Sequence, residues 1–392
     1  MKKIFNWPLA VSSFTLKDKL KIAWWLLRND RYTMGEKVLE FERKFSEYSG
    51  MHALAVSSGS AANQVVFELW KHKHPDVKPS GVTVIVPAVT WVSSITPATM
   101  AGFKIKFCDV NLDDFSFDYK KLEGILKKSK PGKTIIWPTA LIGFCPEMNF
   151  LNKLAEKYKA DLFLDSCENT MSNYRGSSIL SSCDVTTTSC YFSHQITAIE
   201  FGFVFFKSED DFKFGKMFRN HGLCRSLDVQ DRVAPIQENP DVDKDFLFLI
   251  DGTNLRPTDI NAMFGLKDFE RINDYTSNRI GVFDEFFYSL DKEKYYLPNR
   301  NYTLDCSGFC LPIICKDESQ KNRIKAYLDS IGIETRPIIG GNLLRQPIFK
   351  KYGNPLRFPN AEYLHNHGFY VGINNKTTIE DVKSLVKILN NS

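Results

Sequence analysis

The chain has 392 residues, of which 43% are apolar and 25% are charged, proportions typical of a globular protein and not of a disordered one. Its net charge of +5 comes without any run of lysine and arginine interleaved with aromatic residues, so the sequence predicts no nucleic-acid binding. The apolar stretch at 22–27 is too short to cross a bilayer, and we expect no membrane segment.

From about residue 50 to 255 the chain alternates short β-branched segments with amphipathic ones. After a first helix at 16–28, we expect helices near 60–72, 92–101, 117–127, 149–159 and 209–219. Strands are expected near 83–87, 104–108, 134–138, 161–165, 185–190 and 202–206. This alternation is typical of βαβ units in a mostly parallel sheet, whose ligands bind at the carboxyl ends of the strands.

The rest of the chain predicts a smaller unit. We expect a long helix near 258–288, strands near 308–314 and 334–339, and helices near 317–330 and 376–390. This order indicates an α+β arrangement. The sequence therefore predicts a large α/β domain over 1–255 and a small C-terminal α+β domain over 256–392.

Small and aromatic residues mark two candidate binding positions. Gly59, Ser60 and Ala61 form a turn that opens a helix, where free N–H groups and the helix dipole suit a phosphate. Small residues at a helix start also serve simply as caps. Trp91 follows the strand expected at 83–87, and it is either a core tryptophan or a ring that stacks on a ligand.

Polar residues follow two further strands. Asp165 ends the strand near 161–165, and Glu168 comes three residues later, as a ligand-facing acid or as a solvated acid at a helix start. Ser189 begins the run S-C-Y-F-S-H-Q-I-T-A-I-E-F-G, which contains His194. Imidazole moves protons near neutral pH, so His194 is the candidate catalytic residue.

This run resembles S-F-x-x-x-K-x-I-x-x-x-E-G-G, the signature of the DegT/DnrJ/EryC1/StrS family of nucleotide-sugar aminotransferases. His194 stands where the family has the lysine that forms a Schiff base with pyridoxal 5'-phosphate (PLP), and no lysine occurs between Lys159 and Lys207. The run G-T-N-L-R-P at 252–257 resembles the family's G-Y-N-x-R-P. The resemblance implies the aspartate-aminotransferase-like fold type I, with a mostly parallel central sheet and a smaller C-terminal α+β domain.

The resemblance also implies roles for these residues. The cofactor-binding residues would be Gly59, Ser60, Ala61 and Ser189 at the phosphate, Trp91 on the pyridine ring, Asp165 at its nitrogen and Glu168 at its phenolic oxygen. Asn254 would reach the cofactor phosphate of the partner in a homodimer with shared active sites. Arg219, His221 and Arg336 are candidate contacts to the substrate or to the carboxylate of the co-substrate, and the alternative for each is a surface charge.

In the family that this sequence resembles, histidine in place of the lysine is the mark of the 3-dehydratases of deoxysugar biosynthesis. These enzymes hold PLP or pyridoxamine 5'-phosphate (PMP) non-covalently. The strings Y-T-M-G-E at 32–36 and G-I-E-T-R-P-I at 332–338 resemble the enzymes that act on GDP-4-keto-6-deoxy-D-mannose. The implied reaction converts a nucleotide-linked 4-keto-6-deoxy sugar to the 4-keto-3,6-dideoxy sugar, with L-glutamate as amino donor, for the O-antigen of lipopolysaccharide. The run at 341–347 also resembles CDP-hexose dehydratases, which leaves the nucleotide open.

Two other functions stay open: an aminotransferase with an atypical base, and a non-catalytic cofactor-binding homologue. Phe201 replaces the first glycine of E-G-G, where the backbone usually comes close to another segment, so the local geometry is expected to differ. Nine cysteines without a C-x-x-C pair, in a chain without a convincing signal peptide, indicate a cytoplasmic protein with no metal site.

Overall fold

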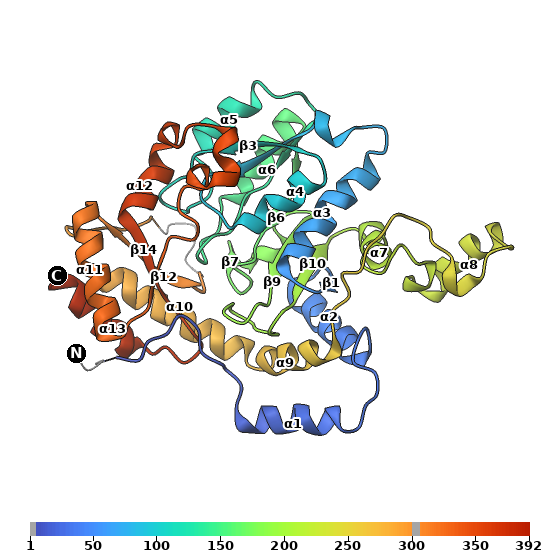
Figure 1. Cartoon of the computed structure of the whole chain (residues 1–392), viewed down its shortest axis with the longest axis horizontal. Helices are drawn as coiled ribbons and strands as arrows, with labels where there is room; N and C mark the ends of the chain where they lie inside the picture. The colour runs from blue at the N-terminus through green and yellow to red at the C-terminus, as the bar shows by residue number, and fades with distance from the viewer. Residues whose placement is uncertain (1–4, 300–305) are drawn as a thin grey trace.

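The computed structural model describes residues 5–299 and 306–392. Its central sheet has two parts, ordered β3-β2-β4-β5 and β1-β10-β9-β6 (Figure 1). The strands are β1 (His52–Val56), β2 (Thr83–Pro87), β3 (Lys104–Cys108), β4 (Thr134–Ile136), β5 (Asp161–Leu162), β6 (Leu164–Asp165), β9 (Val185–Ser189) and β10 (Gly202–Phe206). All neighbours pair in parallel except β10, which is antiparallel to both β1 and β9. The mostly parallel sheet is therefore confirmed.

The strand expected at 161–165 is split. Its first half, β5, pairs with β4, and its second half, β6, pairs with β9, with Phe163 between them. The Phe163 N–H still donates to Ile136 O and the Asp165 N–H to Pro138 O. The two parts of the sheet therefore meet along one continuous stretch of chain, which ends at the candidate site.

Alternating residues of the strands enter two hydrophobic cores on opposite faces of the sheet. In β10, Val204 and Phe206 join one core, whereas Phe203 and Phe205 join the other. Such alternation follows from the two-residue period of a strand. The first core receives apolar residues from α3 (Gly59–Lys73) and α7 (Glu209–Phe218), and the second from α2 (Glu36–Ser49), α5 (Tyr119–Leu126), α6 (Met148–Tyr158) and α9 (Asp259–Phe269).

The C-terminal part carries a separate antiparallel sheet in the order β11-β12-β14-β13. Its strands are β11 (Tyr295–Tyr296), β12 (Cys310–Cys315), β13 (Thr335–Pro337) and β14 (Gly368–Gly372), and its helices are α11 (Glu318–Ile331), α12 (Pro359–His367) and α13 (Ile379–Asn390). This confirms the α+β arrangement. The boundary at residue 255 stays a prediction.

Three helical expectations change in detail. The segment expected as one helix near 258–288 forms α9 and α10 (Ile272–Ser289), because the chain turns at Glu270 and Arg271. The helix expected at 92–101 is a 3₁₀ turn at 92–94 followed by α4 (Thr96–Met100). The first helix, α1 (Leu16–Leu26), ends two residues early. In the described chain, no helix combines the length and the apolar character that a bilayer crossing requires.

Candidate active site

A cavity of about 510 Å³ lies at the carboxyl ends of β6 and β9. It brings together eight of the residues that the sequence singled out: Gly59, Ser60, Trp91, Asp165, Glu168, Ser189, His194 and Arg336. The small domain contributes the opposite wall through Phe309, Arg336, Pro337, Ile339 and Tyr370. The candidate residues, spread over nearly 280 positions of sequence, thus line one cavity.

One end of the cavity is the N-terminus of α3. Gly59 and Ser60 lie in its first turn, where main-chain N–H groups have no partner within the helix. A Cβ on Gly59 would lie 2.7 Å from the Ser189 Cβ, and one on Gly202 would lie 2.4 Å from the Ser58 carbonyl. These contacts leave room only for glycine, and the resulting cradle of backbone N–H groups fits a phosphate.

Asp165 is buried at the floor of the cavity. Its Oδ2 accepts hydrogen bonds from Asn63 Nδ2 at 2.9 Å and Ser94 Oγ at 2.6 Å, and its Oδ1 accepts one from the Cys167 N–H at 3.1 Å. Asn63 is itself oriented by Thr187 Oγ1, which donates to its Oδ1. These three donors fix the orientation of the Asp165 carboxyl group, which can pair with a protonated ring nitrogen. Asn63 and Ser94 are functional neighbours that the sequence analysis missed.

Glu168 is a buried carboxyl group of the opposite character. Its Oε2 accepts the Ile142 N–H at 2.9 Å, but burial and the nearby Asp165 raise the pKa of Glu168 to about 8. At neutral pH the group is therefore mostly protonated. Because Oε2 is the acceptor for Ile142, the proton belongs on Oε1, where it can be donated to a ligand. The alternative of a solvated acid at a helix start is wrong, since Glu168 is buried.

The imidazole of His194 is held on three sides. Its Nδ1 lies 2.7 Å from the Cys167 carbonyl oxygen. Because a carbonyl oxygen can only accept, Nδ1 carries the ring proton and donates a hydrogen bond to that oxygen. The rings of Tyr191 and Phe309 meet the imidazole edge-on, at centroid distances of 5.8 and 5.2 Å. Burial lowers the pKa of His194 to about 4. The ring is therefore neutral at physiological pH, and Nε2 is its unprotonated nitrogen.

Trp91 and Phe201 settle two questions that the sequence left open. Trp91 is 57% exposed and lines the cavity, so it is not a core tryptophan. Phe201 is fully buried and packs against Phe41 and Phe203 in the second core. The close backbone approach is made by the next residue, Gly202. The departure from E-G-G therefore leaves the phosphate cradle in place.

The remaining predicted residues lie elsewhere. Ala61 is buried one position deeper in α3, and its N–H donates to Ser58 Oγ. Arg219 is buried away from the cavity, bound to Glu42 and to the Ala55 carbonyl, so its side chain is committed to the protein interior.

Two of the predicted ligand-binding residues lie on the surface. His221, in a left-handed conformation with φ 61°, and Asn254 are both exposed. The expected substrate contacts of Arg219 and His221 are therefore not brought to this chain's cavity. Arg336 does line it, and pairs with Glu334 at 2.7 Å.

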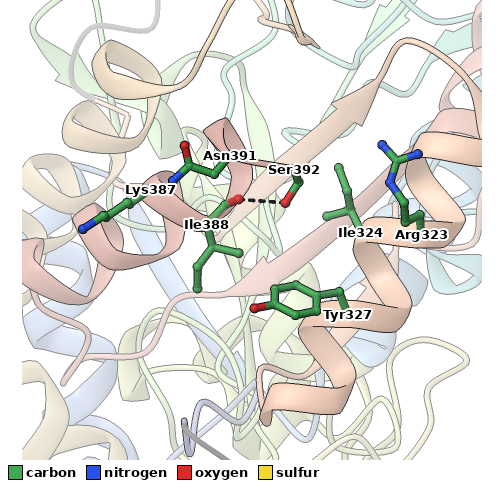
Figure 2. Close-up of a pocket in the computed structure, with 7 residues that line it drawn as sticks. All are labelled: Arg323, Ile324, Tyr327, Lys387, Ile388, Asn391 and Ser392. Carbon is green, nitrogen blue, oxygen red and sulfur yellow. Dashed lines mark hydrogen bonds between the residues drawn. The ribbon is translucent and has the colours of Figure 1, made fainter.

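A second cavity of about 480 Å³ lies between α11 and α13 (Figure 2). Its charged side chains are Arg323 and Lys387, and the hydroxyl of Ser392 is already bound to the Ile388 carbonyl. His194 and Glu168, the acid–base groups with shifted pKa values described above, line the first cavity instead. Within residues 5–299 and 306–392 no group of three His, Cys, Asp or Glu side chains is arranged to hold a metal ion.

Comparison with known proteins agrees with this geometry. The sequence profile of the DegT/DnrJ/EryC1/StrS aminotransferase family matches residues 15–390. The chain is 29% identical to a GDP-4-keto-6-deoxy-D-mannose 3-dehydratase of Yersinia pseudotuberculosis, over 99% of this chain and 100% of that protein.

Solved structures show the same similarity. The E. coli GDP-4-keto-6-deoxy-D-mannose-3-dehydratase with bound hydrated PLP superposes with a TM-score of 0.89 at 26% identity, covering 98% of this chain and all of that one. A GDP-4-keto-6-deoxymannose-3-dehydratase with a trapped PLP-glutamate geminal diamine gives 0.89 at 27% identity, with the same coverage. The fold is the aspartate-aminotransferase-like fold type I, and the chain belongs to the DegT/DnrJ/EryC1/StrS aminotransferase family.

Proposed function

We propose that this protein is a PLP/PMP-dependent 3-dehydratase of a nucleotide-linked 4-keto-6-deoxy sugar, with GDP-4-keto-6-deoxy-D-mannose as the expected substrate and L-glutamate as the amino donor. The observation that carries the proposal is His194, which lines the cavity with Nε2 as its unprotonated nitrogen, while no lysine is found among the described residues that line it. The names of the similar proteins support the same substrate class.

The cavity residues fit the cofactor. Gly59, Ser60 and Ser189 would hold its phosphate, Trp91 would cover its ring, and Asp165 would pair with its ring nitrogen. When bound, PMP supplies an amine that condenses with the sugar 4-keto group and a ring that takes up electrons from its methylene carbon. The cofactor is held non-covalently, because imidazole cannot form the bond that a lysine amine makes.

His194 moves the protons. Being neutral, its Nε2 accepts a proton from the methylene carbon of the cofactor, while Nδ1 stays bound to the Cys167 carbonyl. The same environment that disfavours the imidazolium makes it a stronger acid once formed. It can therefore return its proton to the departing 3-hydroxyl. Glu168, protonated at neutral pH, would donate to the phenolic oxygen of the ring.

A second copy of the chain completes this proposal. None of the residues of α8 (Val229–Glu238), all of which the structure describes, is buried, and Figure 1 shows the helix projecting from the body. Nearby Phe246 and Phe248 are also exposed. A ten-residue helix without packing is marginal in water, which supports a partner chain covering this arm. We infer a homodimer in which the exposed Asn254 binds the cofactor phosphate of the partner.

Mass spectrometry with the purified protein, L-glutamate and GDP- or CDP-4-keto-6-deoxyhexose tests the reaction. The expected sugar product has lost one oxygen, and 2-oxoglutarate and ammonia appear in equal amounts. An amine retained in the sugar would identify an aminotransferase instead. Cofactor binding without turnover of either nucleotide sugar would identify a binding protein. For the dimer, Asn254→Ala should weaken cofactor binding, and a fully active monomer in sedimentation experiments would exclude shared sites.

A further inference from the structure

Phe309, the residue just before β12, brings the small domain into contact with the catalytic histidine. Phe309 lines the cavity, and its ring lies edge-on to His194 at 5.2 Å with an interplanar angle of 78°. The neighbouring Gln195 is buried, and its Nε2 donates to Ser307 Oγ at 2.6 Å and to the Gly308 carbonyl at 3.3 Å. The histidine loop and the stretch at 307–309 are therefore fastened to each other at adjacent residues.

A second connection runs from Phe309 to the other acid–base group of the cavity. The Phe309 N–H donates to the Ile142 carbonyl at 3.0 Å, and the Ile142 N–H donates to Glu168 Oε2 at 2.9 Å. The backbone of Ile142 thus links Glu168 to Phe309, which packs on His194.

The backbone at this connection is sterically strained. Ile142 has φ 60°, a left-handed conformation that a β-branched residue rarely adopts. The next residue, Gly143, leaves no room for a side chain, since a Cβ there would lie 2.7 Å from the Phe309 nitrogen. Strained conformations persist where surrounding contacts over-determine them, and they gather at functional sites. Here the contacts are Glu168 on one side and Phe309 on the other.

We propose that Phe309 is a positioning residue that holds the His194 imidazole in place and limits its exposure to water, and that Ile142 ties this placement to Glu168. The inference rests on the proposed role of His194 as the acid and base. With Tyr191 on the other edge, Phe309 restricts rotation of a ring otherwise fixed by one hydrogen bond at Nδ1. Arg336 and Tyr370 line the same wall of the cavity as Phe309. The small domain therefore supplies both a contact to the catalytic base and side chains that face the rest of the cavity.

The test is an NMR titration of the His194 ring nitrogens in the cofactor-free protein, which needs no turnover. In the wild type we expect a titration midpoint near 4. In Phe309→Leu the aromatic ring that covers one edge of the imidazole is lost, so the imidazole is more exposed to water and the midpoint should move toward the ordinary value of about 6.5. Phe309→Tyr keeps the ring and should titrate as the wild type does. In turnover, Phe309→Leu should lower kcat by about 10- to 100-fold with little change in KM.

Phe283→Leu is the matched control, because Phe283 packs beneath Gly308. It should lower stability without moving the His194 midpoint. An unchanged midpoint in folded Phe309→Leu overturns the inference, and so does an equal change in Phe283→Leu. If Phe309→Leu does not fold, Phe309→Met replaces it with the same two outcomes. Failure of the dehydratase proposal would show instead as missing product with the titration as expected.

Discussion

The Nδ1 atom of His194 lies 2.7 Å from the carbonyl oxygen of Cys167, two residues beyond the floor carboxylate Asp165. A carbonyl oxygen can only accept, so the contact fixes the tautomer with the proton on Nδ1. The basic nitrogen, Nε2, is then the one left for the ligand. The end of β6 therefore positions Asp165, and the residues that follow it determine that Nε2 is the ring nitrogen of His194 available for proton transfer.

Replacing this imidazole should abolish most of the activity. His194→Asn removes the proposed acid and base, and loss of positioned proton transfer typically costs ~10²–10⁴-fold in rate. The measurement is ammonia release from GDP-4-keto-6-deoxy-D-mannose with glutamate. His74→Asn is the control, since His74 makes a similar Nδ1 contact to the Trp70 carbonyl outside the cavity. Near-normal release in His194→Asn would mean that another residue moves the proton.

The cofactor should exchange freely in the wild type. No lysine lies in the sequence between 160 and 206, so borohydride should fail to attach PLP to the chain, and dialysis should remove it. His194→Lys supplies an amine at the same position and should become labelled on reduction. Peptide mapping distinguishes the two proteins. A pyridoxyl-lysine peptide from the wild type would contradict non-covalent binding.

Glu168 should make stability fall as pH rises. Its pKa is about 8 in the folded protein and near 4.5 when exposed, so between these values the folded state holds a proton that the unfolded state has released. The stabilisation is complete below about 4.5 and is lost as pH rises to about 8. His194, with a pKa of about 4, acts in the opposite direction between 4 and 6.5. The buried cysteines, whose pKa values are also raised by desolvation, add to the decline only above about pH 8. Urea unfolding from pH 6.5 to 8 therefore reports Glu168.

The variant for this measurement is Glu168→Gln. Its amide can still accept from the Ile142 N–H and donate to the ligand, as the protonated acid does. We expect the decline in stability between pH 6.5 and 8 to disappear. Glu123→Gln, at a surface pair with Lys157, should keep the wild-type decline. A decline that persists in Glu168→Gln would show that Glu168 is ionised at neutral pH.

Gly202→Ala should damage the phosphate cradle. The added Cβ would meet the Ser58 carbonyl at 2.4 Å, which is backbone and cannot rotate away. Overpacking of this kind costs roughly 1–3 kcal/mol, and cofactor affinity should fall because Gly59 and Ser60 move with Ser58. Gly124→Ala is the matched control, since a Cβ there meets nothing within 4 Å. Fluorescence titration with PLP measures the affinity, and equal affinities in the two variants would contradict the cradle.

Much of this site could be predicted because it follows from local patterns. Asp165, Ser189 and Trp91 come directly after apolar strands, and the ends of parallel strands gather at one edge of a sheet. Whether Trp91 was a core residue could not be decided from the sequence, because its exposure depends on what the small domain leaves uncovered.

Other members of the site depend on tertiary contacts. Asn63 reaches Asp165 across 102 positions and Phe309 reaches His194 across 115, and no periodic pattern reports such pairs. The separation of α9 from α10 was missed for a similar reason, since Glu270 and Arg271 are ordinary helix formers. The exposed helix α8 carries Val229, Val233 and Ile236 at helical spacing, but such a pattern does not report that the body of the chain leaves this face uncovered.

The reversed strand β10 has a consequence for how the chemistry of this site can vary. Ser189, the last residue of β9, pairs directly with Gly202, the first of β10. The twelve residues between them leave and re-enter the sheet at the same edge, with both ends anchored under the phosphate cradle. His194 lies inside this hairpin, whereas Trp91, Asp165 and the first turn of α3 lie outside it. The choice between lysine and histidine chemistry is therefore carried by one hairpin, and the residues expected to bind the cofactor ring come from other elements.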